Sequence, residues 1–483
     1  MIRRIVVITT TLIALYAILF RGWPLAATHS GPTVGVFPVG GLPSPSALAS
    51  QPHFSLGPTR QISNPADQLD NAEVELAASR SGRYVYAAWI GVNEVTGRTY
   101  DIRFAASDNG GKSFGRSIGL PGSAPNGRHP GGPWDPAVAV GPNGTVYVSF
   151  MIQAKNTFYP VVEASFDHGR TFPQVSYLRV PPKDAGNFGD RDFLAVAPNG
   201  SLYLTWDFSP SAASVDVACP PHSSCYFKAG ELNIVVQKSV DGGKSWRPMI
   251  HVTPGFPNGG ADSAPLLVQR NGHVDVDFQA YHVSHDGRHR LSTAHAYFTD
   301  STNGGTSWSR PVRIGPTNPT MSHTNWWVDG DMSGDRAGNL YATWDTQDGK
   351  HDIGWLSYSE DHGRVWSRPR RVTPDATNAL HIVEVSGGPA GMADVAWLSS
   401  SSPKGYGLYL REFSIKKGWL TGAVRVSKQF GRTSHWPGDT FGIAALPGSG
   451  ISHRVLLSWA SLVGSNANSR VIARVATFIQ GNK

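Results

Sequence analysis

The stretch Ser165-Phe166-Asp167-His168-Gly169-Arg170-Thr171-Phe172 is the best-formed copy of a short loop that occurs five times in this chain of 483 residues. Its pattern is Ser-x-Asp-x-Gly-x-Thr-aromatic, with Asn replacing Asp or Ser replacing Thr in some copies. The copies begin at Ser107, Ser165, Ser239, Ser301 and Ser359, with successive spacings of 58, 74, 62 and 58 residues. These spacings are typical of propeller blades rather than solenoid turns, and they predict an array of small sheets.

The repeated loop has a physical role that requires no active site. An Asp or Asn side chain accepts hydrogen bonds from backbone amides a few residues on, the Gly supplies a positive φ, and the aromatic residue packs on the sheet. We therefore predict a structural hairpin turn around each of the residues Asn109, Asp167, Asp241, Asn303 and Asp361.

The units between these loops predict an all-β propeller with four-stranded antiparallel blades. The second unit shows the pattern most plainly, with strands expected at 135–140, 145–152, 161–165 and 176–180. Two further units follow the fifth loop without a good copy of it. In the first of them, Lys416-Lys417-Gly418-Trp419 stands where a sixth loop is due, and we interpret it as an eroded copy.

The last unit predicts a ring of seven blades that is closed by an N-terminal strand. This unit has three strands before the chain ends, and the segment Thr59–Ser63 resembles the fourth strands of other blades. A ring closed with strands from both ends leaves no open first or last blade and so no exposed sheet edge there. A six-bladed ring is the alternative.

The repeated loop resembles the Asp box, or BNR repeat, of the sialidase-like β-propellers, and segments 189–196 and 438–444 look like strands of secreted bacterial members. The resemblance covers roughly Thr59 to Phe478, so a sialidase-like propeller is expected over residues 57–483, with a box between the third and fourth strands, on the outer rim. It also implies an exo-sialidase-like glycoside hydrolase. Sialidases carry an early Arg-Ile-Pro segment and bind the substrate carboxylate with three Arg. No such segment occurs near the first blade, and nothing in the sequence identifies Arg128, Arg191 and Arg336 as that triad.

The candidate site lies where the innermost strands begin, because propellers usually gather function around the central channel. The acids expected there as catalytic candidates are Asp135, Asp192, Asp329 and Asp439. The residues expected to bind substrate are Trp134, Arg191, His323, Trp326, Trp327, His435 and Trp436. Paired carboxyl groups suit glycoside hydrolysis, and several aromatic residues around one concave site suit sugar stacking. The structural alternative is that each acid caps its own strand or turn.

The N-terminus predicts export. Arg3 and Arg4 precede an apolar run over 5–20, and small residues follow it, so residues 1–27 read as a signal peptide or a membrane anchor. Residues 28–56 are rich in Pro, Gly and Ser and read as a linker. In an exported protein, Cys219 and Cys225 are expected to form a local disulfide within a long insertion in the third blade.

Composition and motifs exclude several functions. The formal charge of +7 is scattered along the chain without a nucleic-acid motif. No phosphate-binding Gly loop, Cys-x-x-Cys, His-Glu-x-x-His or Gly-x-Ser-x-Gly motif occurs, so we assign no cofactor and no metal site.

Three functional hypotheses follow. The first is a glycoside hydrolase that acts on extracellular glycan at the central channel. The second is a non-catalytic propeller that binds carbohydrate or a cell-surface protein, and the third, weaker one is a metal-dependent lyase or hydrolase. We expect a monomer located outside the cell or at its surface, in contact with the membrane only through its N-terminal segment.

Overall fold

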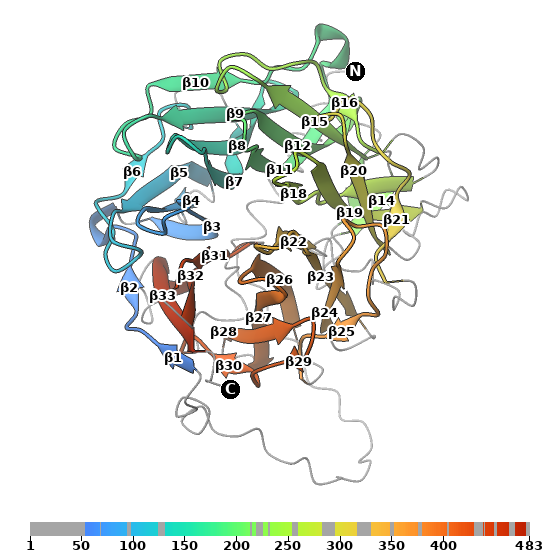
Figure 1. Cartoon of the computed structure of the whole chain (residues 1–483). Helices are drawn as coiled ribbons and strands as arrows, with labels where there is room; N and C mark the ends of the chain where they lie inside the picture. Colours follow the sequence, from blue (N-terminus) through green and yellow to red (C-terminus); the bar gives the residue numbers. More distant parts are fainter. Residues whose placement is uncertain are drawn as a thin grey trace, which may run out of the picture.

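The computed structural model describes residues 54–67, 69–93, 98–123, 131–212, 215–218, 226–229, 232–253, 259–282, 295–315, 330–347, 352–374, 379–402, 405–428, 438, 440–448, 452–462 and 469–479. The described strands form seven antiparallel sheets arranged as blades around a common axis, and one separate two-stranded sheet (Figure 1). The predicted seven-bladed all-β propeller is therefore confirmed, and the six-bladed alternative is wrong. No helix among these residues is long and apolar enough to cross a membrane.

The first three blades each run outward from their first strand. Blade 1 consists of β3 (Asp70–Ala78), β4 (Val85–Asn93), β5 (Arg98–Ser107) and β6 (Ile118–Gly119). Blade 2 consists of β7 (Gly131–Val140), β8 (Val146–Ala154), β9 (Thr157–Ser165) and β10 (Gln174–Tyr177). Blade 3 consists of β11 (Phe188–Val196), β12 (Leu202–Ser209), β15 (Asn233–Ser239) and β16 (Ile250–His251).

The next three blades follow the same order, with the innermost strand of blade 4 broken in two. Blade 4 consists of β17 (Gly259–Asp262), β18 (Leu266–Val268), β19 (Val274–His282), β20 (His295–Ser301) and β21 (Val312–Arg313). Blade 5 consists of β22 (Asp331–Gly334), β23 (Leu340–Gln347), β24 (Asp352–Ser359) and β25 (Arg370–Arg371). Blade 6 consists of β26 (Ala379–Gly387), β27 (Met392–Ser402), β28 (Gly405–Ser414), β29 (Gly418–Trp419) and β30 (Val424–Arg425).

Blade 7 combines strands from both ends of the described chain. It contains β31 (Gly442–Leu446), β32 (Ser452–Leu462) and β33 (Ser469–Ile479), and both β1 (Phe54–Leu56) and β2 (Arg60–Gln61) pair with β33. The predicted closing strand is confirmed. The outer edge begins earlier than expected, at Phe54, so it takes in the last three residues of the range predicted as linker.

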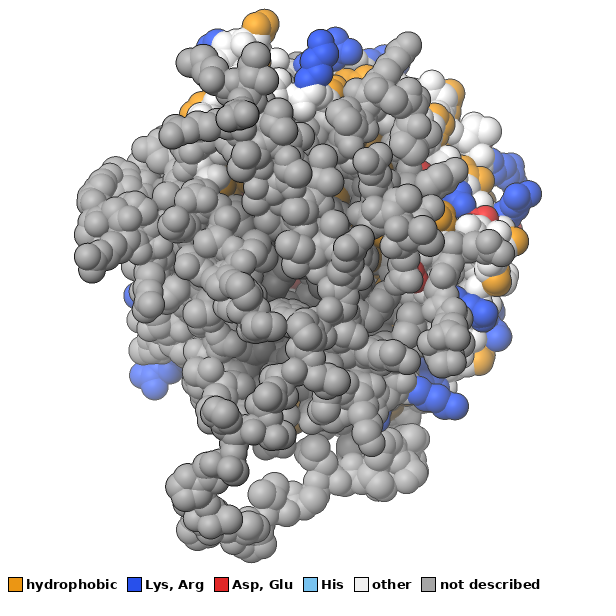
Figure 2. Space-filling model, turned by 180° about the vertical axis from the view of Figure 1, so that it is seen from behind, with side chains coloured by type: hydrophobic (Ala, Val, Ile, Leu, Met, Phe, Trp, Pro, Cys, Tyr) orange, Lys and Arg blue, Asp and Glu red, His pale blue; other side chains and the backbone are white. Residues whose placement is uncertain are grey.

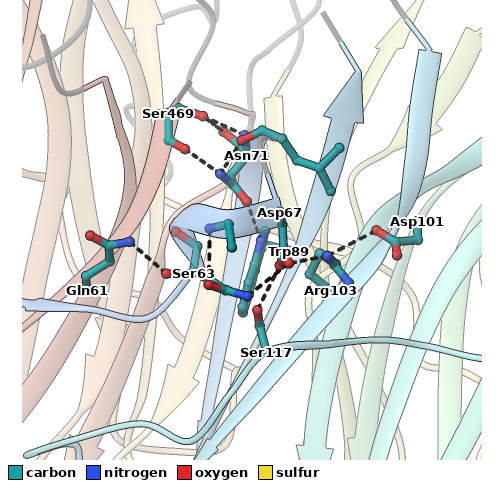
Figure 3. Close-up of polar contacts among 12 residues, drawn as sticks. Gln61, Ser63, Asp67, Asn71, Trp89, Asp101, Arg103, Ser117 and Ser469 are labelled. Carbon is teal, nitrogen blue, oxygen red and sulfur yellow. Dashed lines mark hydrogen bonds and ion pairs between the residues drawn. The ribbon is translucent and has the colours of Figure 1, made fainter. Parts of the chain in front are cut away.

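Polar contacts fasten this closure to blade 1 (Figure 3). Ser469 at the start of β33 donates its hydroxyl to the Asn71 carbonyl at 2.9 Å. Its backbone amide donates to Asp70. The Asn71 side chain in turn accepts a hydrogen bond from the buried Trp89 indole at 2.6 Å. Asp67, in the 3₁₀ turn η1 (Pro65–Asp67), forms an ion pair with Arg103 of blade 1 at 2.7 Å.

The insertion in blade 3 lies between its second and third strands, as predicted. It contains a small hairpin of β13 (Asp216–Ala218) and β14 (Tyr226–Ala229), in which Ala218 pairs with Tyr226. Cys219 and Cys225, between these strands, lie outside the described residues. A further 3₁₀ turn, η2 (Pro182–Asp184), lies between blades 2 and 3.

The repeated loops form the turns between third and fourth strands, where the sequence placed them. In the loop of blade 2, Asp167 Oδ1 accepts the Thr171 amide at 2.9 Å, and Oδ2 accepts the Thr171 hydroxyl at 2.7 Å. Burial opposes ionisation, but these bonds, together with those from Ser165 and the Arg170 amide, outweigh it and lower the pKa of Asp167 to about 2. The ionised Asp167 carboxylate thus holds the turn together through its hydrogen bonds.

The loops also join neighbouring blades, which the sequence did not reveal. Gly169 has φ +82°, and a Cβ on it would lie 2.5 Å from the Phe104 ring of blade 1. Next to it, His168 stacks on Tyr84 of blade 1, with ring centroids 4.0 Å apart. Glycine is therefore required at this position both for its backbone conformation and for the close approach of two blades.

Candidate functional site: two cavities on the propeller axis

Two cavities lie along the axis, and the innermost strands line both. The acidic cavity, of about 140 Å³, is lined by residues that include Glu75, Asp135, Asp192, Asp331 and Glu384. The arginine cavity, of about 590 Å³, is lined by the last residues of several innermost strands and by the turns that follow them. Strand β22 contributes to both, with Asp331 at one end and Gly334 at the other.

Strained backbone surrounds the acidic cavity. Glu73, Asp135, Arg191 and Ser263, one in each of the first four blades, have φ of 51°, 50°, 47° and 51°. Register shifts interrupt β3, β7 and β11 at these positions. A non-glycine residue in this conformation costs about 1–3 kcal/mol, and such residues cluster at functional sites. Contacts elsewhere in the ring must therefore hold them.

Carboxylates of one blade hold the strained residues of the next. The Asp135 amide donates to Glu73 Oε2 at 3.0 Å, and the Arg191 amide donates to Asp135 Oδ2 at 2.9 Å. The Ser263 amide donates to Asp207 Oδ2 at 3.2 Å. The structural alternative expected each acid to cap its own strand, whereas these acids stabilise the neighbouring blade. Glu73, Asp135 and Asp207 therefore have a structural role.

Asp331 has a related position between blades 5 and 6. Its Oδ2 accepts the Val385 amide of blade 6 at 2.7 Å, and its Oδ1 accepts the Met332 amide at 2.7 Å. Burial raises the pKa of Asp331, but these two amides and a hydrogen bond with Glu384 partly offset that effect. Asp331 is for this reason favoured to ionise before its carboxyl neighbours.

The carboxyl groups near Asp331 are held in the protonated form. Burial, followed by the charge of Asp331, raises the pKa of Glu75 to about 8. Burial, followed by the charges of Asp331 and Glu75, raises the pKa of Glu384 well above its ordinary value. Neutral carboxylic acids and one favoured carboxylate thus lie together on one side of the cavity.

Asp192 lines the acidic cavity from blade 3 and has no comparable anchoring. Its side chain is only 3% exposed, and neither carboxyl oxygen makes a hydrogen bond of normal geometry with a described residue. Burial is the main cause that raises its pKa well above the ordinary value, and the charge of Asp135 adds to it. The Ser149 hydroxyl opposes this rise only in part, so the hydrogen-bonding capacity of the buried Asp192 carboxyl is not filled by the described residues and is available to a ligand.

The structure places only some of the predicted site residues. Asp135, Arg191 and Asp192 line the acidic cavity. Trp134 is 9% exposed, donates its indole N–H to Asp190 at 2.8 Å, and packs edge-on against Phe158. Trp134 therefore belongs to the supporting wall and offers no open face for sugar stacking, which corrects its predicted role.

The remaining predicted residues lie outside the described part of the chain; they are Asp329, Asp439, His323, Trp326, Trp327, His435 and Trp436. The acidic cavity also contains Glu75, Asp331 and Glu384, which share no motif and were not among the acids chosen as catalytic candidates. The one sequence signal for them is an acid at the start of an innermost strand. Within the described residues, no group of three or more His, Cys, Asp or Glu is arranged to hold a metal ion.

Arginine is divided between the two cavities. Among described residues, Arg191 is the one Arg that lines the acidic cavity, whereas Arg336 lines the arginine cavity together with Arg80 and Arg270. Arg191 and Arg336 thus cannot act on one substrate group. On the face seen in Figure 2, the Lys and Arg side chains that are coloured lie dispersed around the edge.

Comparison with known proteins supports the fold. No family model matches this sequence, and no curated protein matches it. A Dyadobacter fermentans protein of unknown function has a similar structure, with a TM-score of 0.53, 12% identity, and coverage of 89% of this chain and 100% of that one. At this identity the likeness shows the propeller fold alone.

Two glycan-related structures are also similar, at lower scores. The Hadza microbial sialidase has a TM-score of 0.49 and 12% identity, covering 80% of this chain and 76% of that one. An α-L-arabinanase from Penicillium chrysogenum, solved with arabinobiose, has a TM-score of 0.44 and 14% identity, covering 73% and 95%. Function is therefore inferred from the cavities themselves.

Proposed function

We propose that this chain is an exported glycoside hydrolase that uses the acidic cavity. The observation that carries the proposal is that Asp192 and Asp331 line the same cavity in opposite environments. Asp192 is buried and accepts no backbone amide from a neighbouring blade, and the Ser149 hydroxyl only partly offsets the effect of burial on its pKa, whereas Asp331 accepts two backbone amides. Pairs of carboxyl groups whose environments separate their pKa values are characteristic of acid and base roles.

The chemistry of glycoside cleavage assigns the roles. Protonated Asp192 donates its proton to the glycosidic oxygen as the bond to the anomeric carbon breaks, and the leaving group departs as an alcohol. Ionised Asp331 acts from the other side, either by deprotonating water or by attacking the anomeric carbon. Glu75 and Glu384 remain protonated, and the Glu384 hydrogen bond favours the ionised form of Asp331.

A neutral sugar suits this cavity better than a sialic acid does. Planar carboxylates are bound by paired forks of arginine, and one described Arg, Arg191, lines the acidic cavity. A substrate carboxylate would also face the ionised Asp331. We therefore expect turnover of neutral glycosides in preference to sialosides.

A panel of fluorogenic neutral glycosides and sialosides, assayed with the secreted form, tests the proposal. Asp192→Asn removes the acidic proton at nearly constant size and should lower kcat by about 100-fold or more. Because substrates with good leaving groups need little protonation, an activated aryl glycoside should lose less activity than an unactivated one. Absence of turnover across the panel would overturn the enzyme proposal.

A specific observation supports a second candidate, a non-catalytic glycan-binding propeller. Glu73, Asp135 and Asp331 each accept a hydrogen bond from at least one backbone amide. A structural role therefore accounts for several of the acidic residues in and around the acidic cavity. Under this alternative, a glycan array would show binding without turnover, and Asp192→Asn would alter affinity alone.

The location outside the cell is part of the proposal and rests on the N-terminal sequence. Export would allow Cys219 and Cys225 to pair in the insertion of blade 3, whose flanking strands are hydrogen-bonded at Ala218 and Tyr226. Thiol titration of the unfolded protein, with and without reductant, measures this pairing. Two reactive thiols before reduction would contradict it.

A further inference from the structure

The turns that border the arginine cavity repeat one geometry. In blade 1 the Gly82 amide donates to the Ser79 carbonyl at 2.7 Å, and in blade 4 the Gly272 amide donates to Gln269 at 2.9 Å. In blade 5 the Gly338 amide donates to Asp335 at 3.1 Å. Each is a four-residue turn that ends in a glycine with φ between +68° and +90°.

Arginine occupies the same position in these three turns. Arg80, Arg270 and Arg336 each follow the first residue of the turn, and all three line the arginine cavity. In the equivalent turns of blades 2 and 3 this position is Pro142 and Pro198. The backbone conformation at the second position of such a turn favours proline. Turn geometry therefore does not explain why three blades have arginine there.

No described carboxylate neutralises these arginines. None of the three forms an ion pair with a described residue. The lining carboxylate, Asp335, is already used, because it accepts hydrogen bonds from the backbone of Ala337, Asn339 and Gly391 and from the side chains of Asn339 and Tyr341. Asp335 therefore fixes the turn that carries Arg336.

The acidic residues beneath the cavity are also paired. His453 lines the cavity, and its Nε2 lies 3.3 Å from Asp394 and 3.6 Å from Glu412, both buried. Burial alone would lower the pKa of His453, but Asp394 and Glu412 raise it, so this cluster tends to balance its own charge. The three arginines thus remain without a counter-charge from it.

We propose that the arginine cavity binds a small ligand that carries an oxyanion, namely a phosphate, sulfate or carboxylate group on a compact body. Arg80, Arg270 and Arg336 would supply forked N–H donors from three blades, and such donors match the geometry of these anions. Leu267, Leu340 and Leu446 provide apolar wall for the body of the ligand. The cavity volume of about 590 Å³ lies within the range of about 300–1,000 Å³ usual for small-ligand sites.

This site is separate from the proposed hydrolase site, and its test does not depend on turnover. Isothermal titration calorimetry with sodium phosphate, sodium sulfate and sodium citrate, at an ionic strength held constant with NaCl, compares the three anion classes. The wild-type protein should bind at least one of them saturably. Arg80→Gln, Arg270→Gln and Arg336→Gln should each weaken binding by about tenfold, and the triple variant should abolish it.

A matched control, Arg83, directly follows the turn that carries Arg80. Arg83 packs over the Tyr84 ring at 5.2 Å, donates to the Asp108 carbonyl at 3.3 Å, and does not line the cavity. Arg83→Gln should leave anion binding unchanged, as should Asp192→Asn. Absence of saturable binding with all three anions would overturn the proposal. So would undiminished binding by the triple variant, or an equal loss in Arg83→Gln, which would indicate non-specific charge attraction.

Discussion

The acidic cavity and the arginine cavity are built on the same set of innermost strands, yet they treat charge in opposite ways. In the acidic cavity, burial neutralises carboxyl groups or backbone amides anchor them, as they anchor Asp331. In the arginine cavity, Arg80, Arg270 and Arg336 are exposed and lack ion-pair partners among the described residues. A pseudo-symmetric scaffold can thus carry a proton-rich site and a cationic site on one axis.

The difference follows from how the backbone is hydrogen-bonded at the two ends of the innermost strands. At the acidic cavity, residues with a left-handed backbone conformation, such as Asp135 and Arg191, are held by hydrogen bonds to carboxylates of adjacent blades. Those carboxylates therefore have a structural role. At the arginine cavity, the turn is closed by its own backbone bonds and a glycine. Its second position is then free to vary, and three blades place arginine there.

The largest expected effect is the loss of stability when the hydrogen-bonded carboxylate of either cavity is removed, Asp335 in the arginine cavity or Asp331 in the acidic cavity. Asp335→Ala removes the acceptor for five hydrogen bonds and should lower the free energy of unfolding by about 4 kcal/mol. Asp331→Ala leaves two backbone amides without an acceptor and should cost about 2–3 kcal/mol. Urea denaturation measures both.

The isosteric variant Asp335→Asn provides the control, because its amide oxygen still accepts hydrogen bonds while one acceptor is replaced by a donor. Its loss in the free energy of unfolding should lie between zero and that of Asp335→Ala. If Asp335→Ala proved as stable as the wild type, the view that this carboxylate is committed to the turn would be untenable.

The next effect is the pH dependence that the acidic cavity alone should show. Glu75 has its pKa raised from 4.5 to about 8, so the folded state binds a proton that the unfolded state releases above pH 4.5. The stability contributed by that proton is complete below pH 4.5 and is lost as the pH rises towards about 8. Glu75→Gln should make the free energy of unfolding less dependent on pH between those limits.

Thermal unfolding at a series of pH values measures the difference between Glu75→Gln and the wild type. Arg80→Gln serves as the comparison from the other cavity and should keep the wild-type slope. Parallel curves for Glu75→Gln and the wild type would show that Glu75 titrates normally in the folded protein.

The smallest effect concerns repulsion in the arginine cavity. Combined substitution of Arg80, Arg270 and Arg336 by Gln should stabilise the protein without ligand by about 0.5–1 kcal/mol at low salt, because like charges at partly screened distances repel. The gain should disappear in molar NaCl. A gain that persisted at high salt would point to a cause other than charge.

The sequence predicted the architecture well because the repeat encodes it locally. The Asp167 loop needs only hydrogen bonds within a few residues, so its spacing predicted the blades, and Thr59–Ser63 predicted the closing strand. The site was harder to predict because it depends on neighbouring blades. Nothing local shows that Asp135 anchors Arg191, that Trp134 is buried, or that Arg80, Arg270 and Arg336 meet at one cavity.

A crystal structure of the protein in millimolar sodium selenate tests the contrast between the two cavities most directly, because anomalous scattering locates selenium without ambiguity. We predict an anomalous peak in the arginine cavity, within hydrogen-bonding distance of Arg80, Arg270 and Arg336, and none in the acidic cavity. A peak beside Asp192 and Asp331, or an arginine cavity without selenate in crystals that bind it elsewhere, would contradict the account.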